Sequence, residues 1–137
     1  MTQIELASNN KASKTMRAVA EIEGVGLKFL KENIASGRIV IPDNPRHVKS
    51  KPCAIGHGLR TKINANIGTS SDESGLGDEL EKLKVSIECG ADTVMDLSIG
   101  GDIPAILKSI LRESTIPIGT VPIYEAAQAV TKRKGSF

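Results

Sequence analysis

A chain of 137 residues is long enough for one ordinary domain and short for two. Its 18 basic residues nearly balance its 16 acidic ones, and only 2% of its residues are aromatic. This composition argues against a nucleic-acid-binding protein, which needs a basic face and aromatic platforms for base stacking. The one dense basic run, at 132–134, is explained by a solvated tail.

The two cysteines, Cys53 and Cys89, form neither a Cys-x-x-Cys motif nor a disulfide framework. A reduced, intracellular setting is therefore the expectation. Residues 1–30 lack the apolar core of a signal peptide, and no apolar run reaches membrane-spanning length. We expect a cytoplasmic protein that has no membrane partner.

Residues 1–60 predict an N-terminal cap region that is helical and irregular. Apolar spacing predicts one helix that ends at Gly24 and a second, over 26–36, that ends at Gly37. The segment 38–42 predicts a short strand closed by proline, and the prolines and glycines of 43–60 predict an irregular connection.

Residues 61–137 predict alternating strands and helices, with strands over 62–67, 93–97 and 117–121. A polar loop is expected over 68–77. The helix expected over 78–90 has Asp78 as its N-cap and an inward face of Leu80, Leu83, Val85 and Ile87. Asp102 is expected to cap a helix that Pro104 opens, and a last helix is expected from Glu125.

This order predicts an α/β fold with parallel strands, either half of a doubly wound sheet or three units of a (β/α)₈ barrel. Three units of a barrel leave apolar edges and an unfilled interior. We therefore expect the chain to hold only the first units of such a barrel, as a fragment or a chain completed from elsewhere.

Asn66, Met95 and Tyr124 are spaced 29 residues apart, each at or just past the end of an expected strand. Parallel strands bring their carboxyl ends to one edge, where α/β proteins place their chemistry. Asn64 shares the face of Asn66, and the hydrogen-bonding groups of the two side-chain amides are satisfied either by each other or by a ligand. Met95 is either core or ligand-facing, and Asp96 then points to the opposite face. Tyr124 either packs at the rim or directs its hydroxyl to a ligand.

Other polar residues carry weaker signals. The segment 98–102 resembles a phosphate-binding loop before a helix, although paired glycines also mark ordinary turns. His47 and His57 have no second ligand at metal spacing and are expected on the surface. Arg60 and Lys62 flank the first expected strand, where they either meet an anionic substrate or are simply exposed.

Four long motifs occur in order along the chain. They are Gly37-Arg-Ile-Val-Ile-Pro42, Gly58-Leu-Arg-Thr-Lys-Ile-Asn-Ala-Asn-Ile-Gly-Thr-Ser70, Gly90-Ala-Asp-Thr-Val-Met-Asp-Leu-Ser98 and Gly119-Thr-Val-Pro-Ile-Tyr124. Together they resemble the N-terminal part of the phosphomethylpyrimidine synthase family, and the resemblance covers essentially the whole chain.

The resemblance implies a radical S-adenosylmethionine lyase of thiamine biosynthesis, which converts 5-aminoimidazole ribotide into hydroxymethylpyrimidine phosphate. It implies a homodimer with a (β/α)₈ barrel, a [4Fe–4S] cluster and a divalent metal such as zinc. Asn66, Met95 and Tyr124 would contact the substrate. The catalytic residues, the metal ligands and the cluster cysteines would lie beyond residue 137, so Cys53 and Cys89 do not take that role.

The chain departs from the family pattern at Ile99 and Glu125, where the family usually has threonine and glutamine. A sister family, 5-hydroxybenzimidazole synthase of anaerobic cobamide synthesis, uses the same substrate and is an alternative. Another alternative is an inactive fragment that acts only as a binding or assembly module.

Overall fold

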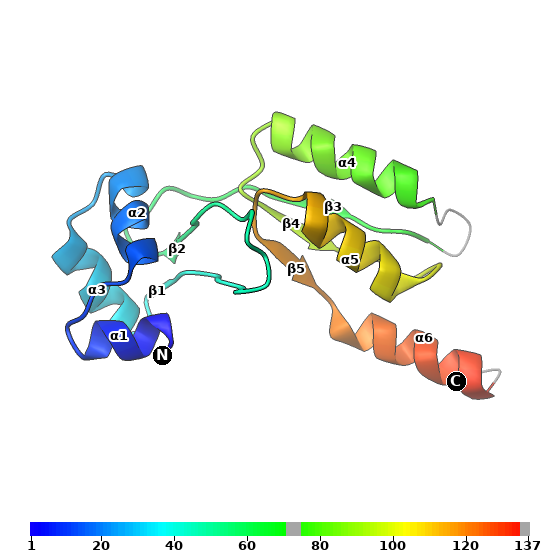
Figure 1. Ribbon diagram of the computed structural model, residues 1–137, viewed down its shortest axis with the longest axis horizontal. Helices are drawn as coiled ribbons and strands as arrows, with labels where there is room; N and C mark the ends of the chain where they lie inside the picture. Colours follow the sequence, from blue (N-terminus) through cyan, green and yellow to red (C-terminus); the bar gives the residue numbers. More distant parts are fainter. Residues whose placement is uncertain (71–74, 135–137) are drawn as a thin grey trace. The chain divides into compact units, whose positions relative to one another are not determined.

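The computed structural model describes residues 1–70 and 75–134 (Figure 1). Its chain divides into two compact units. The first unit comprises Met1–Arg46 and Lys51–Lys62, and the second comprises His47–Ser50 and Ile63–Phe137.

Three helices and a small hairpin make up the first unit: α1 (Gln3–Ser8), α2 (Lys14–Glu23), α3 (Leu27–Ala35), β1 (Ile39–Val40) and β2 (Ile55–Gly56). Thr2 and Glu5 form a capping box on α1, and the bond that the Thr2 backbone N–H donates to Glu5 lowers the pKa of that carboxyl. Gly24 ends α2 in the left-handed conformation, with φ 65°, as its position in the sequence predicts.

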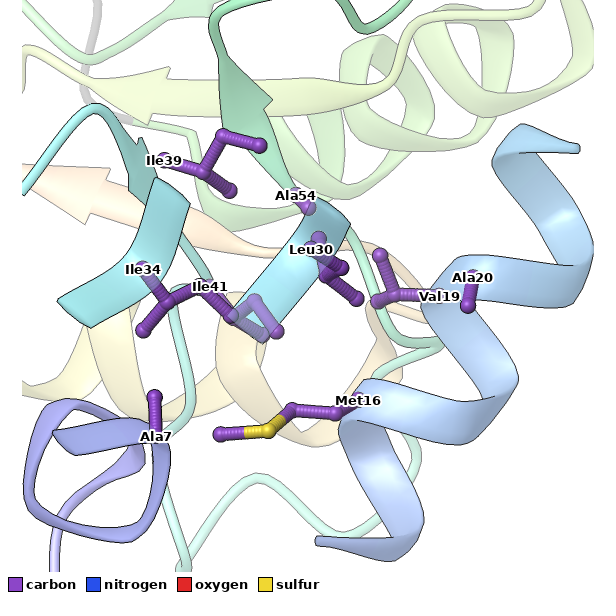
Figure 2. Close-up of a cluster of buried hydrophobic side chains, with 9 residues drawn as sticks. All are labelled: Ala7, Met16, Val19, Ala20, Leu30, Ile34, Ile39, Ile41 and Ala54. Atoms are coloured by element: carbon purple, nitrogen blue, oxygen red, sulfur yellow. The ribbon is translucent and has the colours of Figure 1, made fainter. Parts of the chain in front are cut away.

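The first unit has its own hydrophobic core, drawn in Figure 2. Met16, Val19 and Ala20 bring the buried stripe of α2 to this core, and Leu30 and Ile34 bring that of α3. The predicted helical spacing is therefore confirmed for both helices. The same core is completed by Ala7, Ile39, Ile41 and Ala54.

The strand predicted over 38–42 is reduced to the two residues of β1, which pair antiparallel with β2. The expectation that 43–60 is wholly irregular was incomplete, because β2 lies within it. Two residues are too few to display the alternation by which a strand is recognised.

Three parallel strands in the order β3-β4-β5 form the sheet of the second unit. The strands are β3 (Asn64–Ile67), β4 (Thr93–Asp96) and β5 (Ile118–Thr120), and the helices are α4 (Leu76–Glu88), α5 (Ile103–Glu113) and α6 (Pro122–Lys134). The predicted α/β alternation with a parallel sheet is therefore confirmed.

One face of this sheet is covered by α4 and α5. Ile67 and Val94 point to this face and pack with Leu83, Ile106 and Ile110 of the two helices. Because side chains alternate along a strand, Asn64, Asn66 and Met95 point to the opposite face. That second face carries the candidate site.

Two helix boundaries differ from the predictions. The N-cap of α4 is Gly75 rather than Asp78, and Asp78 lies in the first turn. Val85, expected to point inward, is half exposed, whereas Glu79 is buried. The last helix begins at Pro122, a favourable residue for a first turn, rather than at Glu125.

The predicted loop over 68–77 is described only at its two ends, and the side chains of the basic run at 132–134 lie outside the described part. Within 1–70 and 75–134, none of the helices is long and apolar enough to cross a membrane.

Candidate functional site

Asn66 and Met95 are direct neighbours across the sheet. They are partners in the parallel register of β3 and β4, and Met95 is in turn the partner of Gly119 on β5. The three residues therefore form one row across the uncovered face, close to the carboxyl ends of the strands. The structure brings together two of the three residues that the regular spacing indicated.

Hydrogen bonds fix the orientation of the Asn66 amide. Thr93 Oγ1 donates to Asn64 Oδ1 at 2.8 Å, and Asn64 Nδ2 donates to Asn66 Oδ1 at 2.9 Å. This relay leaves Asn66 Nδ2, a donor, pointing outward without a partner among the described residues. Asn64 and Asn66 satisfy each other in part, and Asn66 retains the capacity to bind an acceptor.

Gly119 makes room for the Met95 side chain. A Cβ atom at Gly119 would overlap the Met95 sulfur. The thioether therefore occupies the space over β5 that the side chain of any other residue at position 119 would fill. Met95 is only partly buried, and its sulfur is an adaptable apolar contact at the centre of the row.

Tyr124 lies apart from this row, in the first turn of α6, and its side chain is 40% exposed. Its backbone N–H donates to the Val121 carbonyl at 3.0 Å, which closes the turn from β5 into the helix. Within the described residues, no hydrogen bond joins its hydroxyl to Asn66 or to β4.

A buried polar network lies at the same edge. Asp96 Oδ1 accepts from Ser98 N at 3.0 Å and from Ser98 Oγ at 2.5 Å, and Thr69 N donates to Ser98 Oγ at 3.1 Å. Thr69 Oγ1 donates to the Gly100 carbonyl at 2.7 Å. Asp96 points away from the Met95 face, as predicted, and its carboxylate is engaged within the protein.

Glu79 supports the same loops from α4. Its Oε2 accepts from Gly68 N at 2.8 Å, and its Oε1 forms an ion pair with Lys82. A glutamate in the first turn of a helix ordinarily faces solvent, so the sequence gives no signal for this burial.

His47 was expected on the surface but is buried, and Lys62 has neither of its two expected roles. His47 is 7% exposed, and its Nε2 lies 2.9 Å from the carbonyl oxygen of Ser114 at the end of α5. Lys62 forms a 2.8 Å ion pair with Glu23, and both side chains are 5% exposed. Lys62 is thus engaged by Glu23 within the first unit. His57 is exposed, as predicted.

The described residues do not fit an iron–sulfur cluster or a divalent metal. No three His, Cys, Asp or Glu side chains come together within 1–70 and 75–134. Cys53 and Cys89 belong to different units, whereas a [4Fe–4S] cluster needs several cysteine thiolates at one place.

Three parallel strands in consecutive order, alternating with helices, place this chain among the α/β proteins. Residues 2–137 match the Radical SAM ThiC family, and the chain belongs to that family.

Named relatives agree with this assignment. The chain is 52% identical over 138 residues to a phosphomethylpyrimidine synthase of Thermus thermophilus. It is 49% identical to that of Caldanaerobacter subterraneus subsp. tengcongensis and 46% identical to that of Moorella thermoacetica, each over 137 residues. Each match covers 100% of this chain and 32% of the relative, so the chain spans about a third of the length of these curated relatives.

Proposed function

We propose that this chain supplies one wall of the substrate site of a phosphomethylpyrimidine synthase, which converts 5-aminoimidazole ribotide into hydroxymethylpyrimidine phosphate. One observation carries the proposal: Asn66 and Met95 are paired on the uncovered face of a parallel sheet, near its carboxyl edge. Relatives named phosphomethylpyrimidine synthase, 46% to 52% identical to the chain, support the choice of reaction.

The sheet is proposed to be the first part of a (β/α)₈ barrel. In such a barrel the strands follow one another in chain order and the helices all cover the outside. The order β3-β4-β5, with α4 and α5 on the same face, supports this arrangement. The face of Asn66 and Met95 then becomes part of the barrel interior, at the end where barrel enzymes bind their substrates.

Asn66 is proposed to donate a hydrogen bond to the substrate. Its Oδ1 already accepts one hydrogen bond from Asn64, whereas its Nδ2 donates to none of the described residues, so the amide nitrogen offers the larger free capacity to a ligand. A ribotide offers ring nitrogen, hydroxyl and phosphate acceptors for that donor. The relay from Thr93 through Asn64 fixes the orientation of the Asn66 amide and so favours a hydrogen-bond acceptor of the ligand next to Nδ2.

Met95 and Tyr124 are proposed to complete the wall. The Met95 thioether offers an apolar surface against which a planar ring packs. Tyr124, with its hydroxyl, would close the site from the first turn of α6.

S-adenosylmethionine, a [4Fe–4S] cluster and a divalent metal such as zinc are proposed for the complete enzyme, which we propose is a homodimer. Since the described residues do not fit the cluster or the metal, the ligands of both are assigned to sequence outside this chain. The role of this chain is therefore to bind and orient the substrate.

The product of the reaction tests the proposal. The full-length protein, with any sequence that follows Phe137, is incubated without oxygen with 5-aminoimidazole ribotide, S-adenosylmethionine and a reductant. Mass spectrometry should find hydroxymethylpyrimidine phosphate. A hydroxybenzimidazole, or no product from a protein loaded with its cluster, would contradict the proposal.

A further inference from the structure

We infer that Thr69, Asp96, Ser98 and Gln128, here called the mouth network, are positioning residues that hold the three proposed substrate-contacting segments in register. This inference rests on the proposed function. Thr69, Asp96 and Ser98 are buried, and Gln128 is partly buried on α6. We infer that they act on the substrate through Asn66, Met95 and Tyr124.

The mouth network joins the loops that follow β3 and β4. Thr69 N donates to Ser98 Oγ at 3.1 Å, and Thr69 Oγ1 donates to the Gly100 carbonyl at 2.7 Å. Ile99 N donates back to the Thr69 carbonyl at 2.9 Å. Three hydrogen bonds thus link Thr69 to the loop after β4.

These contacts are buried and closely packed. Thr69 and Ser98 are each 3% exposed, and Asp96 is 4% exposed. Gly68 has φ 149°, and a Cβ atom there would lie 2.6 Å from the carbonyl carbon of Leu97, so the two loops meet backbone to backbone. A polar atom that loses its partner in such a place is costly, because water cannot replace the bond.

The loop after β4 also holds α6. Gln128 Nε2 donates to the Gly101 carbonyl at 3.0 Å and lies 3.4 Å from the Ile99 carbonyl. Gln128 lies four residues, about one helical turn, after Tyr124 on α6. The loop after β4 therefore connects the segment of Asn66 with the helix of Tyr124.

The residues of the mouth network lie close to the contact residues along the chain. Asp96 is adjacent to Met95, and Thr69 follows Asn66 by three residues. Each proposed contact residue thus has a residue of the mouth network close to it along the chain, at most about one helical turn away. A small misplacement of a contact group is enough to weaken binding measurably.

The test compares two variants at Thr69 in the full-length protein. Thr69→Val keeps the shape and removes the hydroxyl, whereas Thr69→Ser keeps the hydroxyl. Calorimetric titration with 5-aminoimidazole ribotide, without turnover, should show a Kd raised about tenfold for Thr69→Val, because the displaced loops misplace the contact groups, and within about twofold of wild type for Thr69→Ser. The number of ribotide-binding sites per protein chain should be unchanged in both variants.

Thr131→Val is the matched control, because the Thr131 hydroxyl also donates to a backbone carbonyl, that of Ala127 at 3.1 Å, but lies on the exposed side of α6. Its Kd should equal that of wild type. In addition, the effects of Thr69→Val and Asn66→Ala should be less than additive, because Thr69 acts through Asn66.

Gln128→Leu keeps the inference testable if Thr69→Val does not fold, because Gln128 is only partly buried. It should raise the Kd by about threefold or more through the displacement of Tyr124. The inference is overturned if Thr69→Val shows an unchanged Kd with fewer binding sites, or if Thr69→Val and Thr69→Ser lose the same affinity. It is also overturned if the Kd of Gln128→Leu is unchanged. A wild-type protein that does not bind the ribotide overturns the proposed function instead.

Discussion

Side-chain alternation explains what single residues of the candidate site have in common. Asn64 and Asn66 were predicted to share a face, and Asp96 to oppose Met95, because a strand has a period of two. The structure confirms both predictions. A local rule was sufficient here, since each strand was recognised within two residues of its true bounds.

Other single residues were misjudged because their partners are remote in the sequence. His47 approaches the carbonyl of Ser114, which is 67 residues away, and Lys62 pairs with Glu23 from α2. A histidine among prolines and glycines, and a lysine before a strand, both have the local appearance of surface residues. Only the folded chain reveals the acceptor and the carboxylate that bury them.

Gly119 is expected to control the position of Met95. In Gly119→Ala the new methyl group overlaps the Met95 sulfur and displaces the thioether from β5. We expect the affinity for 5-aminoimidazole ribotide to fall about fivefold to twentyfold, while the free energy of unfolding changes by about 1 kcal/mol or less, because the far end of a flexible side chain moves. Calorimetric titration and urea denaturation of the full-length protein measure the two quantities.

Gly77→Ala is the control for this variant, since a Cβ at Gly77 in α4 meets nothing within 4 Å. It should bind the ribotide as wild type does. An unchanged affinity in Gly119→Ala would remove Met95 from the substrate site.

The Glu23–Lys62 pair is expected to stabilise the first unit strongly. Glu23 also accepts from Arg60 N at 3.1 Å, so Lys62→Met leaves a buried carboxylate without its cation. We expect a loss of about 3–5 kcal/mol in the free energy of unfolding, as for other broken buried pairs. The double variant Glu23→Gln with Lys62→Met should recover part of it in urea denaturation. A loss below about 1 kcal/mol would mean that the pair is effectively solvated.

At the scale of the elements, apolar periodicity predicted every described helix longer than six residues. Candidate N-cap residues predicted the first residue of these helices less well. Asp102 was correctly predicted as the N-cap of α5, where it accepts from Ala105 N at 3.1 Å. Asp78 was the wrong choice for α4, because the helix extends backward through two residues to Gly75. A glycine at an N-cap carries no side-chain signal, so the nearest aspartate attracted the prediction.

The two aspartates are therefore expected to differ in their contribution to stability. Asp102→Ala removes a capping bond and should cost about 0.5–2 kcal/mol of unfolding free energy. Asp78 makes no capping hydrogen bond among the described residues, so Asp78→Ala removes a favourable charge near a helix start and should cost about 0.3–1 kcal/mol. Urea denaturation of both variants, at one ionic strength, compares them. A larger loss in Asp78→Ala would restore Asp78 as the functional cap.

At the scale of the whole molecule, the sequence predicted the α/β class of the fold and its parallel sheet. It did not predict the hydrogen-bond network of Thr69, Asp96, Ser98 and Gln128. Thr69 and Gln128 have the appearance of ordinary loop and helix residues, and Ser98 was considered only as part of a phosphate-binding loop. Their hydrogen bonds depend on the close approach of three segments, which no local pattern specifies. The barrel itself stays a prediction.

The isolated chain 1–137 is expected to be poorly stable. Neither outer edge of the β3-β4-β5 sheet has a strand partner among the described residues, and Ile63 and Val85 are 63% and 50% exposed. Open edges and exposed apolar side chains favour association. We expect aggregation or a broad thermal transition by circular dichroism and light scattering. A sharp, reversible two-state melt of a monomer would contradict this expectation.

The affinity of Asn66 variants for 5-aminoimidazole ribotide tests the central claim most directly. The full-length wild type, Asn66→Ala and the exposed control Asn9→Ala are titrated by calorimetry, with circular dichroism to verify folding. We predict that Asn66→Ala raises the Kd about tenfold or more, as expected for a lost substrate hydrogen bond, and that Asn9→Ala does not change it. An Asn66→Ala protein that is folded and binds the ribotide as tightly as wild type would contradict the account.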